Sequence, residues 1–235
     1  MHLVGEILDE ERPRGPVLDP FCGTATTALV CAERGIACDT TDINSFLLWL
    51  AVAKTRRYTP DDLRQLDEGA ARTRSAIAGR AHKGSDWTPA LHRIERWWDA
   101  PALADLARAW AAIRLEAERC STAAVDLLRV AFCRTLIETA NVSFGHQSMS
   151  FRKASDLPNT ARVAGVLADS IARLRRSAAS PIAMIPRAIL CDARSLRTEL
   201  AAATYACVIT SPPYPNRMSY VRAAPSSSCR RSSGV

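Results

Sequence analysis

The sequence lacks a hydrophobic run of the length that a membrane helix requires. No stretch among its 235 residues reaches the roughly 18 to 20 apolar residues that are needed to cross a bilayer. The first fifteen residues carry acidic side chains and no long apolar segment, which argues against a secretory signal or an anchor. We therefore expect a cytoplasmic protein with no membrane partner.

Paired cysteine motifs are also absent, although the chain holds eight cysteines. There is no C-x-x-C pair and no Cys/His spacing of the kind that binds zinc, and the scattered positions are not typical of a disulfide framework. We expect reduced cysteines that pack as small apolar residues, and no metal site.

Lysine is rare, so arginine carries almost all of the positive charge. The formal net charge is +7, and only three of the 31 basic residues are lysines. Between Arg56 and Arg176 there are twenty basic and fourteen acidic residues, so most of the surplus lies in this stretch. Arginine donates paired hydrogen bonds to phosphate oxygens, which is compatible with nucleic acid as a partner. A biased nucleotide composition of the gene is the alternative explanation.

Strand and helix patterns alternate in residues 16–58, within a first domain part that we predict to span 1–58. Two short apolar runs, 16–21 and 36–43, have the length of strands, and each precedes a segment with helical periodicity. Gly35 closes the first of these segments in the position of a helix C-terminus. This order of elements is typical of a βαβ unit that binds a nucleotide.

A long helical stretch separates this unit from two further strands. Residues 59–180 have apolar residues at three- and four-residue spacing, and strand patterns return within 181–222, at 187–193 and 205–211. We predict an α/β fold with a doubly wound, Rossmann-like sheet that is interrupted by an inserted α-helical domain. Residues 223–235, rich in serine and arginine, are predicted to form a disordered tail.

The first strand runs into the sequence Asp-Pro-Phe-Cys-Gly-Thr, which begins at Asp19 and leads into a helix. A glycine turn at the carboxyl edge of a parallel sheet allows a ligand to approach the backbone. Ala25 stands where a second glycine is expected, and the full G-x-G-x-x-G pattern is missing. An ordinary turn between strand and helix is the alternative interpretation.

Acidic residues follow two of the other strands. Asp42 lies nineteen residues beyond Gly23, a distance at which a carboxylate accepts the ribose hydroxyls of an adenosine cofactor. Asp39 is a competing candidate for this role. Asp192, after the third strand, could accept a hydrogen bond from the amino group of an adenine. The alternative for both Asp42 and Asp192 is that each caps a helix.

The fourth strand ends in Thr-Ser-Pro-Pro-Tyr, from Thr210 to Tyr214. Two successive prolines cannot continue a strand ladder, so they fix the chain as a stiff loop. The Ser211 hydroxyl and the Pro212 carbonyl can accept hydrogen bonds from an exocyclic amine, and an aromatic ring can stack on a planar base. A plain surface loop is the alternative.

Together, the segments VLDPFCGTATT, TDIN, CDAR and TSPPY resemble the S-adenosylmethionine-dependent DNA amino-methyltransferases, which methylate cytosine N4 or adenine N6. The resemblance implies S-adenosylmethionine as cofactor, DNA as substrate, and a role of the helical insertion in DNA recognition. It assigns the residues to two groups. Cofactor binding falls to Asp19, Phe21, Gly23, Thr24, Asp42 and Asp192, and the catalytic pocket for the target base falls to Ser211, Pro212, Pro213 and Tyr214.

Serine as the first residue of the catalytic motif favours cytosine N4 over adenine N6 within this family. A restriction endonuclease is a further partner that the resemblance implies. The family's sheet needs about seven strands and only four are found, so we expect a C-terminally truncated member, for which the missing half of the methyltransferase would be another partner.

Two other classes stay open at this point. A dinucleotide-dependent oxidoreductase could be built on the same sheet, but the missing glycines and the Pro-Pro-Tyr loop count against it. A catalytically impaired fragment that binds cofactor or DNA is the second alternative.

Overall fold

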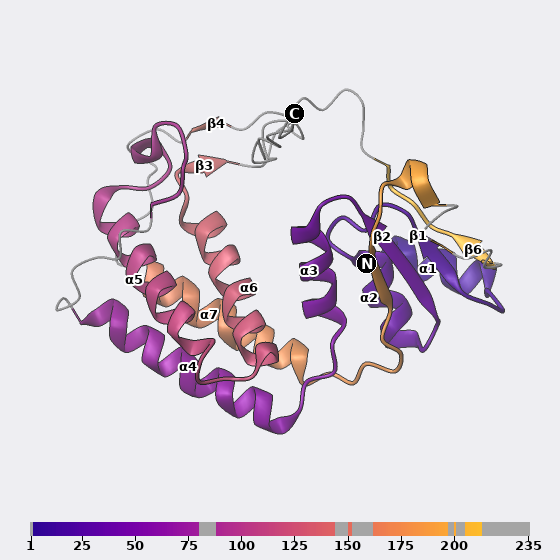
Figure 1. Ribbon diagram of the computed structural model, residues 1–235, viewed down its shortest axis with the longest axis horizontal. Coiled ribbons are helices and arrows are strands. Elements are labelled where there is room, and N and C mark those ends of the chain that lie inside the picture. Colours follow the sequence, from indigo (N-terminus) through magenta and orange to yellow (C-terminus); the bar gives the residue numbers. More distant parts are fainter. Residues whose placement is uncertain are drawn as a thin grey trace, which may run out of the picture.

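The computed structural model describes residues 2–79, 88–143, 150–151, 162–196, 200 and 205–212, and the predicted tail lies outside them. A small parallel sheet with its helices, here called the sheet unit, lies beside a group of longer helices, the helical block (Figure 1). The predicted α/β class is confirmed, and most of the regular structure is helix.

The sheet has four parallel strands in the order β5-β2-β1-β6. They are β1 (Val17–Asp19), β2 (Cys38–Asp42), β5 (Arg187–Leu190) and β6 (Cys207–Val208), and each coincides with a predicted strand. Leu18 pairs with Asp39 on one side and with Val208 on the other. Because β1 is central and short, it is buried along its whole length, as expected for a strand between two parallel neighbours.

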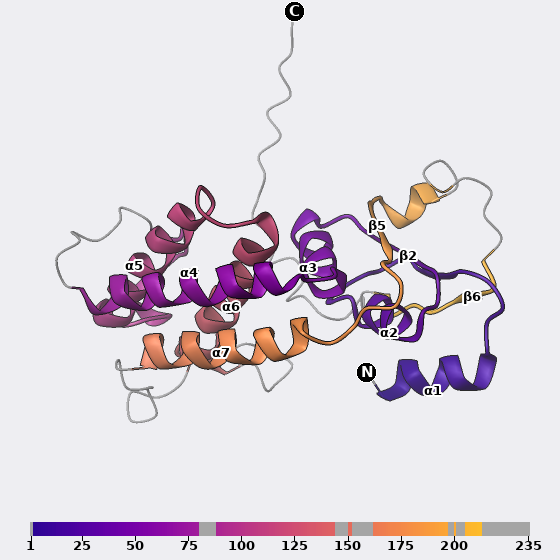
Figure 2. The same ribbon diagram turned by 90° about the horizontal axis from the view of Figure 1, so that it is seen from below.

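Two helices of the sheet unit pack against each other on the strands. They are α2 (Thr26–Arg34) and α3 (Ser45–Thr55), which follow β1 and β2 in the chain. A third helix, α1 (His2–Glu11), lies against α2 (Figure 2). It was not predicted from the sequence. Arg34 holds it in place by donating to the Gly5 carbonyl at 2.9 Å and by pairing with Asp9. These contacts join residues far apart in the sequence, so no local pattern indicates them.

In the described residues, the helical block contains four α-helices, all within the stretch 59–180 for which the sequence predicted helix. They are α4 (Pro60–Ala78), α5 (Ala100–Glu116), α6 (Thr122–Thr139) and α7 (Arg162–Ala178). Thr59 and Asp62 begin α4 with a reciprocal capping box, in which the Asp62 N–H donates to Thr59 Oγ1 at 3.1 Å. Asp99 and Ser121 cap the next two helices with a single hydrogen bond each, which the side chain accepts from the backbone N–H three residues on. No helix in the described part of the chain is long and apolar enough to cross a membrane.

Smaller elements join these helices. A 3₁₀ turn, η1 (Ile94–Arg96), precedes α5, and the two-residue strands β3 (Val142–Ser143) and β4 (Ser150–Phe151) pair antiparallel after α6. A second 3₁₀ turn, η3 (Ala193–Ser195), follows β5.

The helical block has a core of its own, centred on fully buried leucine and isoleucine side chains such as Leu66, Leu106 and Ile113. Glu116 is also buried, at 1% exposure, and Arg72 binds it with two nitrogen donors, the closer at 2.6 Å. A carboxylate can remain charged in such a place because its partner and hydrogen bonds replace the lost water.

One carboxylate joins the helical block to the sheet unit. Asp126 of α6 is buried, and it accepts a hydrogen bond of 2.9 Å from the indole N–H of Trp49 in α3. Arg56, just after α3, places a guanidinium nitrogen 3.3 Å from the other oxygen of the same carboxylate. The inserted block is therefore attached to the helix that follows β2.

The turn before α2 contains two residues with left-handed backbone. Gly23 has φ 50°, and Ala25 has φ 62° with ψ 38°. This conformation costs a residue with a side chain about 1 kcal/mol or more. The observation explains why the sequence pattern leads one to expect glycine at position 25. The Ala25 methyl is fully buried in the core of the sheet unit, which offsets the strain.

Replacing Ala25 by glycine tests this balance. Ala25→Gly loses a buried methyl, worth about 0.8 kcal/mol, but relieves strain of about 1 kcal/mol. We expect the free energy of unfolding to change by less than about 0.5 kcal/mol, as measured by urea denaturation.

Ala28→Gly is the matched control, because Ala28 is equally buried but lies inside α2. It loses the methyl and also the helix preference of alanine, so we expect a loss of about 2 kcal/mol. Equal losses in the two variants would contradict backbone strain at position 25.

Candidate functional site

The candidate site lies at the edge of the sheet where the parallel strands end. Asp19 and Asp42 are the last residues of β1 and β2, Asp192 follows β5 by two residues, and Ser211 follows β6 by three. Because all four strands run the same way, these residues come to one edge. The chain runs from β1 through β2 to β5 on one side and then returns to place β6 on the other side of β1. Such a reversal of strand order is where open parallel sheets bind ligands.

Asp19 is a buried carboxylate at the centre of this edge. It is 3% exposed, and its Oδ1 accepts a hydrogen bond of 3.2 Å from the Phe21 backbone N–H. Burial raises the pKa of Asp19 to about 6, against the opposing hydrogen bonds from Phe21 and Thr27, and the nearby Asp42 raises it slightly further. A buried carboxylate in this state is stabilised by any cation that reaches it.

Asp42 holds the glycine turn at the same edge. Its Oδ2 accepts a hydrogen bond of 3.1 Å from the Gly23 N–H, and its Oδ1 accepts one of 2.9 Å from the Asn44 N–H. The helix cap of α3 is Asn44, whose side chain accepts from Phe46 N at 3.0 Å. The alternative interpretation of Asp42 as the cap of this helix is therefore wrong, and Asn44 is a residue that the sequence pattern missed.

Asp39 is directed to other partners. It lies near the start of β2, where Arg187 donates to its Oδ1 at 3.0 Å and the Tyr205 hydroxyl donates to its Oδ2 at 2.6 Å. Burial acts to raise the pKa of Asp39, but these hydrogen bonds outweigh it and lower the pKa below its ordinary value. Of the two competing acids, only Asp42 lies at the edge with Asp19 and Gly23.

Backbone contacts fix the loop from Pro20 to Thr24. The Cys22 N–H donates to the Thr41 carbonyl at 2.8 Å, and the Thr41 hydroxyl donates to the Pro20 carbonyl at 3.0 Å. Lys54, in the last turn of α3, donates from Nζ to the Thr24 carbonyl at 2.5 Å. Sequence reasoning did not find Lys54, because thirty residues separate it from the loop and no local pattern connects them.

Asp192 takes the alternative role that the sequence left open. It is the N-cap of η3, and its carboxylate binds both the backbone N–H and the guanidinium of Arg194, at 2.9 and 3.0 Å. The Arg194 hydrogen bonds lower the pKa of Asp192 to about 2. Its position is still close to Asp42, because the adjacent Cys191 N–H donates to the Asp42 carbonyl at 3.1 Å.

The predicted catalytic loop begins directly beside β1. The Ile209 N–H donates to the Leu18 carbonyl at 3.0 Å, which continues the pairing of β6 with β1 toward the loop. Ser211 and Pro212 then follow as exposed residues, so their polar groups are accessible to a ligand. Pro213 and Tyr214 lie outside the described residues.

The site offers carboxylates, backbone groups and a hydroxyl as ligand contacts. In the described ranges there is no group of three or more His, Cys, Asp or Glu side chains that could hold a metal ion. Phe21 and Thr24, also predicted to contact the cofactor, are in the turn between Asp19 and α2, half-buried and exposed respectively. The arrangement suits an organic ligand with a cationic group and with hydroxyls.

Comparison of the chain with protein-family models, with curated proteins and with solved structures gives no significant match.

The buried carboxylate makes a prediction about pH. The unfolded chain releases the Asp19 proton near pH 3.8, and the folded protein holds it to about pH 6. The folded state thus binds more protons in this interval, so the contribution of Asp19 to the free energy of unfolding falls as the pH rises through it. Between pH 3.5 and 7, we expect the free energy of unfolding of wild type to fall by about 3 kcal/mol relative to that of Asp19→Asn. Urea denaturation at each pH measures this difference.

Asp39→Asn is the control with the opposite sign. Because the pKa of Asp39 is lowered, wild type should gain stability relative to this variant as the pH rises. If wild type and Asp19→Asn respond to pH in parallel, Asp19 does not have a raised pKa.

Proposed function

We propose that this chain is a DNA amino-methyltransferase with a Rossmann-like sheet, which transfers a methyl group from S-adenosylmethionine to the exocyclic amine of a DNA base, with cytosine N4 preferred over adenine N6. The observation that carries the proposal is the meeting of Asp19, the Gly23–Asp42 hydrogen bond and the Ser211–Pro212 segment at one edge of the sheet. These are the residues that the resemblance assigns to the cofactor and to the target amine.

Asp19 fits the cationic end of the cofactor. S-adenosylmethionine supplies an electrophilic methyl group on a sulfonium and also carries an α-ammonium. A carboxylate that is buried and has a pKa raised to about 6 is favoured in its charged form by such an ammonium. The left-handed Gly23, with no side chain, leaves the backbone open to the ligand at this point.

Asp42 and its neighbour fit an adenosine. Asp42 has carboxylate oxygens with acceptor capacity beyond the Gly23 and Asn44 hydrogen bonds, which suits the two ribose hydroxyls. Ile43 comes directly after it and is 71% exposed, so it offers an apolar surface for the adenine ring. Asp192 would have to exchange its hydrogen bonds with Arg194 before accepting the adenine amine, so its assigned role has the weakest support.

The exposed Ser211–Pro212 segment fits the target amine. The lone pair of an exocyclic amine is delocalised into its ring, which makes the nitrogen a poor nucleophile. The Ser211 hydroxyl and the Pro212 carbonyl can each accept one amine hydrogen and so favour the pyramidal nitrogen that attacks the methyl carbon. The displaced amine proton passes to solvent. Catalysis by this chain is therefore a matter of positioning and electrostatics.

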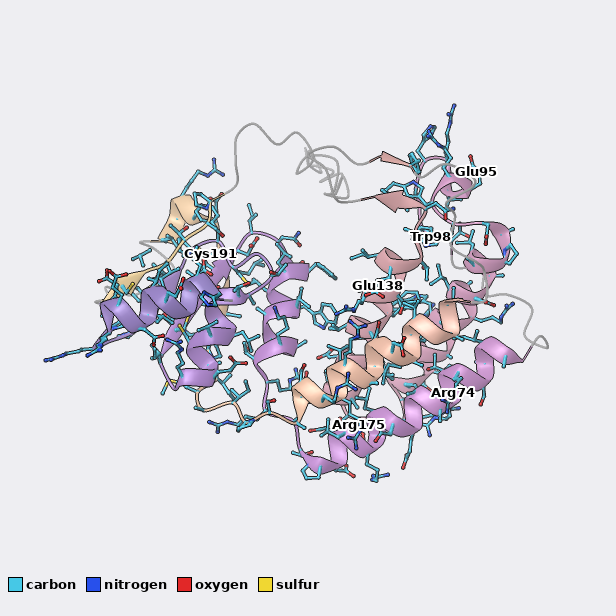
Figure 3. All side chains as sticks on the ribbon, turned by 180° about the vertical axis from the view of Figure 1, so that it is seen from behind. Arg74, Glu95, Trp98, Glu138, Arg175 and Cys191 are labelled. Atoms are coloured by element: carbon cyan, nitrogen blue, oxygen red, sulfur yellow. The ribbon has the colours of Figure 1, made fainter. Side chains whose placement is uncertain are left out.

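The arginines of the helical block give supporting evidence for DNA. Figure 3 shows Arg74 and Arg175 on this block, away from Cys191 on the sheet unit. Several of the arginines are already paired, for example Arg175 with Asp67 and Arg134 with Glu138, so the local field is weaker than the count of charges indicates. The positive charge is therefore secondary support for DNA as substrate, and the main support is the set of residues at the edge of the sheet.

Calorimetry with S-adenosylmethionine tests the cofactor half of the proposal. We expect wild type to bind, and Asp42→Asn to bind at least tenfold more weakly, because the amide keeps an oxygen for Gly23 but loses acceptor capacity for the ribose. Asp39→Asn, on the same strand but away from the edge, should bind as wild type does. Binding of NADH in place of S-adenosylmethionine would favour the oxidoreductase.

Ser211→Ala tests the target half. The rate of methyl transfer to DNA should fall by about ten- to a hundredfold, since one acceptor for the amine is lost. The calorimetric affinity for S-adenosylmethionine should stay unchanged. Thr210→Ala is the matched control, because Thr210 is an exposed hydroxyl residue one position earlier. Equal rates of methyl transfer in both variants would show that the Ser211 hydroxyl does not bind the target amine.

A further inference from the structure

A cavity of about 270 Å³ lies between the sheet unit and the helical block. Residues of α2 and α3 form one wall, and residues of α6, α7 and the segment after α7 form the other. Most of its lining is apolar, from Leu29, Leu127, Val130, Leu174 and Ile182. The surface of the cavity therefore favours a hydrocarbon group.

Two cationic residues contribute to the same cavity. Arg56 is already paired with Asp126, so its charge is neutralised within the protein. Lys54 is different, because its recorded hydrogen bond goes to the uncharged carbonyl of Thr24. In the described ranges Lys54 forms no ion pair with a carboxylate, although the exposed Glu33 also lines the cavity.

Lys54 thus gives the mainly apolar lining a cationic residue that has no ionic partner among the described residues. Burial lowers the pKa of Lys54, so part of its hydration has been lost. An ammonium has three N–H donors, and one of them is used by Thr24. An anionic ligand that reaches this ammonium would restore the missing interaction, and a carboxylate can do so with a charge-assisted hydrogen bond.

We propose that this cavity binds a small organic carboxylate, with the carboxylate on Lys54 and a short apolar tail among Leu29, Val130 and Leu174. The volume is slightly below the range of about 300 to 1,000 Å³ that drug-sized ligands occupy, which limits the ligand to a short chain. The two walls come from different parts of the molecule, so the bound tail also contacts the sheet unit and the helical block at once.

The site has a direct connection to the loop from Pro20 to Thr24, at the candidate site. Lys54 is the residue that holds the Thr24 carbonyl, so a ligand that draws its ammonium away releases this contact. The binding of the carboxylate does not depend on the proposed methyltransferase activity. Its effect on S-adenosylmethionine does rest on that proposal, and coupling of this kind is reciprocal between the two ligands.

Octanoate is the probe for the test, titrated into the full-length chain and followed by methyl NMR. We expect saturable shifts of the Leu29, Val130 and Leu174 methyl signals. Octan-1-ol, which has the same tail without the charge, should bind at least tenfold more weakly. The absence of saturable shifts with octanoate, or equal affinity for the two probes, would overturn the proposal.

Lys54→Met tests the assigned contact, since it keeps an unbranched apolar side chain and removes the charge. Octanoate affinity should fall at least tenfold in this variant and stay unchanged in Arg134→Met, which removes an exposed cation from α6 outside the cavity. Octanol affinity should be the same in wild type and Lys54→Met, which also shows that the variant folds. Unchanged octanoate binding in Lys54→Met would overturn the role of Lys54.

Hydrogen–deuterium exchange, measured without S-adenosylmethionine, tests whether the ligand at Lys54 affects the loop. Saturating octanoate should speed exchange in the peptide that contains Gly23 and Thr24, and should have no such effect in Lys54→Met. Unchanged exchange in the wild type would contradict the coupling. Because this readout contains no cofactor, its failure is separate from a failure of the proposed methyltransferase function.

Discussion

The parallel direction of the four strands is the constraint on which the rest of the structure depends. Asp19, Asp42 and Ser211 are spread over most of the chain, and they meet because β1, β2 and β6 all end at one edge of the sheet. The Gly23 turn and the cap at Asn44 then serve this edge, since both hydrogen-bond to Asp42. A sheet with one strand reversed would separate these groups by the length of a strand.

A second constraint attaches the insertion to this edge through α3. Asp126 is buried between Trp49 and Arg56, and the loss of either partner would leave a charged carboxylate less satisfied away from water. The last turn of the same helix contains Lys54, which donates to the Thr24 carbonyl. The helical block, the cavity and the loop from Pro20 to Thr24 are thus linked by one helix of eleven residues. Any movement of the block against the sheet unit would act on the loop through α3.

The strands and long helices could be predicted because their signals are local. Apolar periodicity, the capping residues Thr59 and Ser121, and the glycine at position 35 each act within a few residues of the element they define. The contents of the site were only partly predictable. The sequence favoured Asp42 and left Asp39 as a competing candidate, and only the structure shows that Arg187, from a strand far along the chain, binds Asp39.

Other features of the site depend on contacts that no sequence pattern contains. Arg34 holds α1, Lys54 holds the loop and Arg194 occupies Asp192, and each was found only in three dimensions. Ala25 is a different case, because its departure from glycine was visible in the sequence and its left-handed backbone gives the physical meaning. The sequence pattern predicts glycine at position 25, where the backbone is left-handed. Burial of the methyl group explains why alanine is tolerated there.

The central claim is that groups gathered at the edge of the sheet transfer a methyl group to a base amine. Nucleoside mass spectrometry of DNA incubated with the folded chain and methyl-labelled S-adenosylmethionine measures this directly. The proposal predicts labelled 4-methylcytosine, formed at a rate that falls at least tenfold when Asp42 is changed to asparagine and the cofactor is below saturation. DNA without any labelled exocyclic amine, from a folded chain that binds the cofactor by calorimetry, would contradict it.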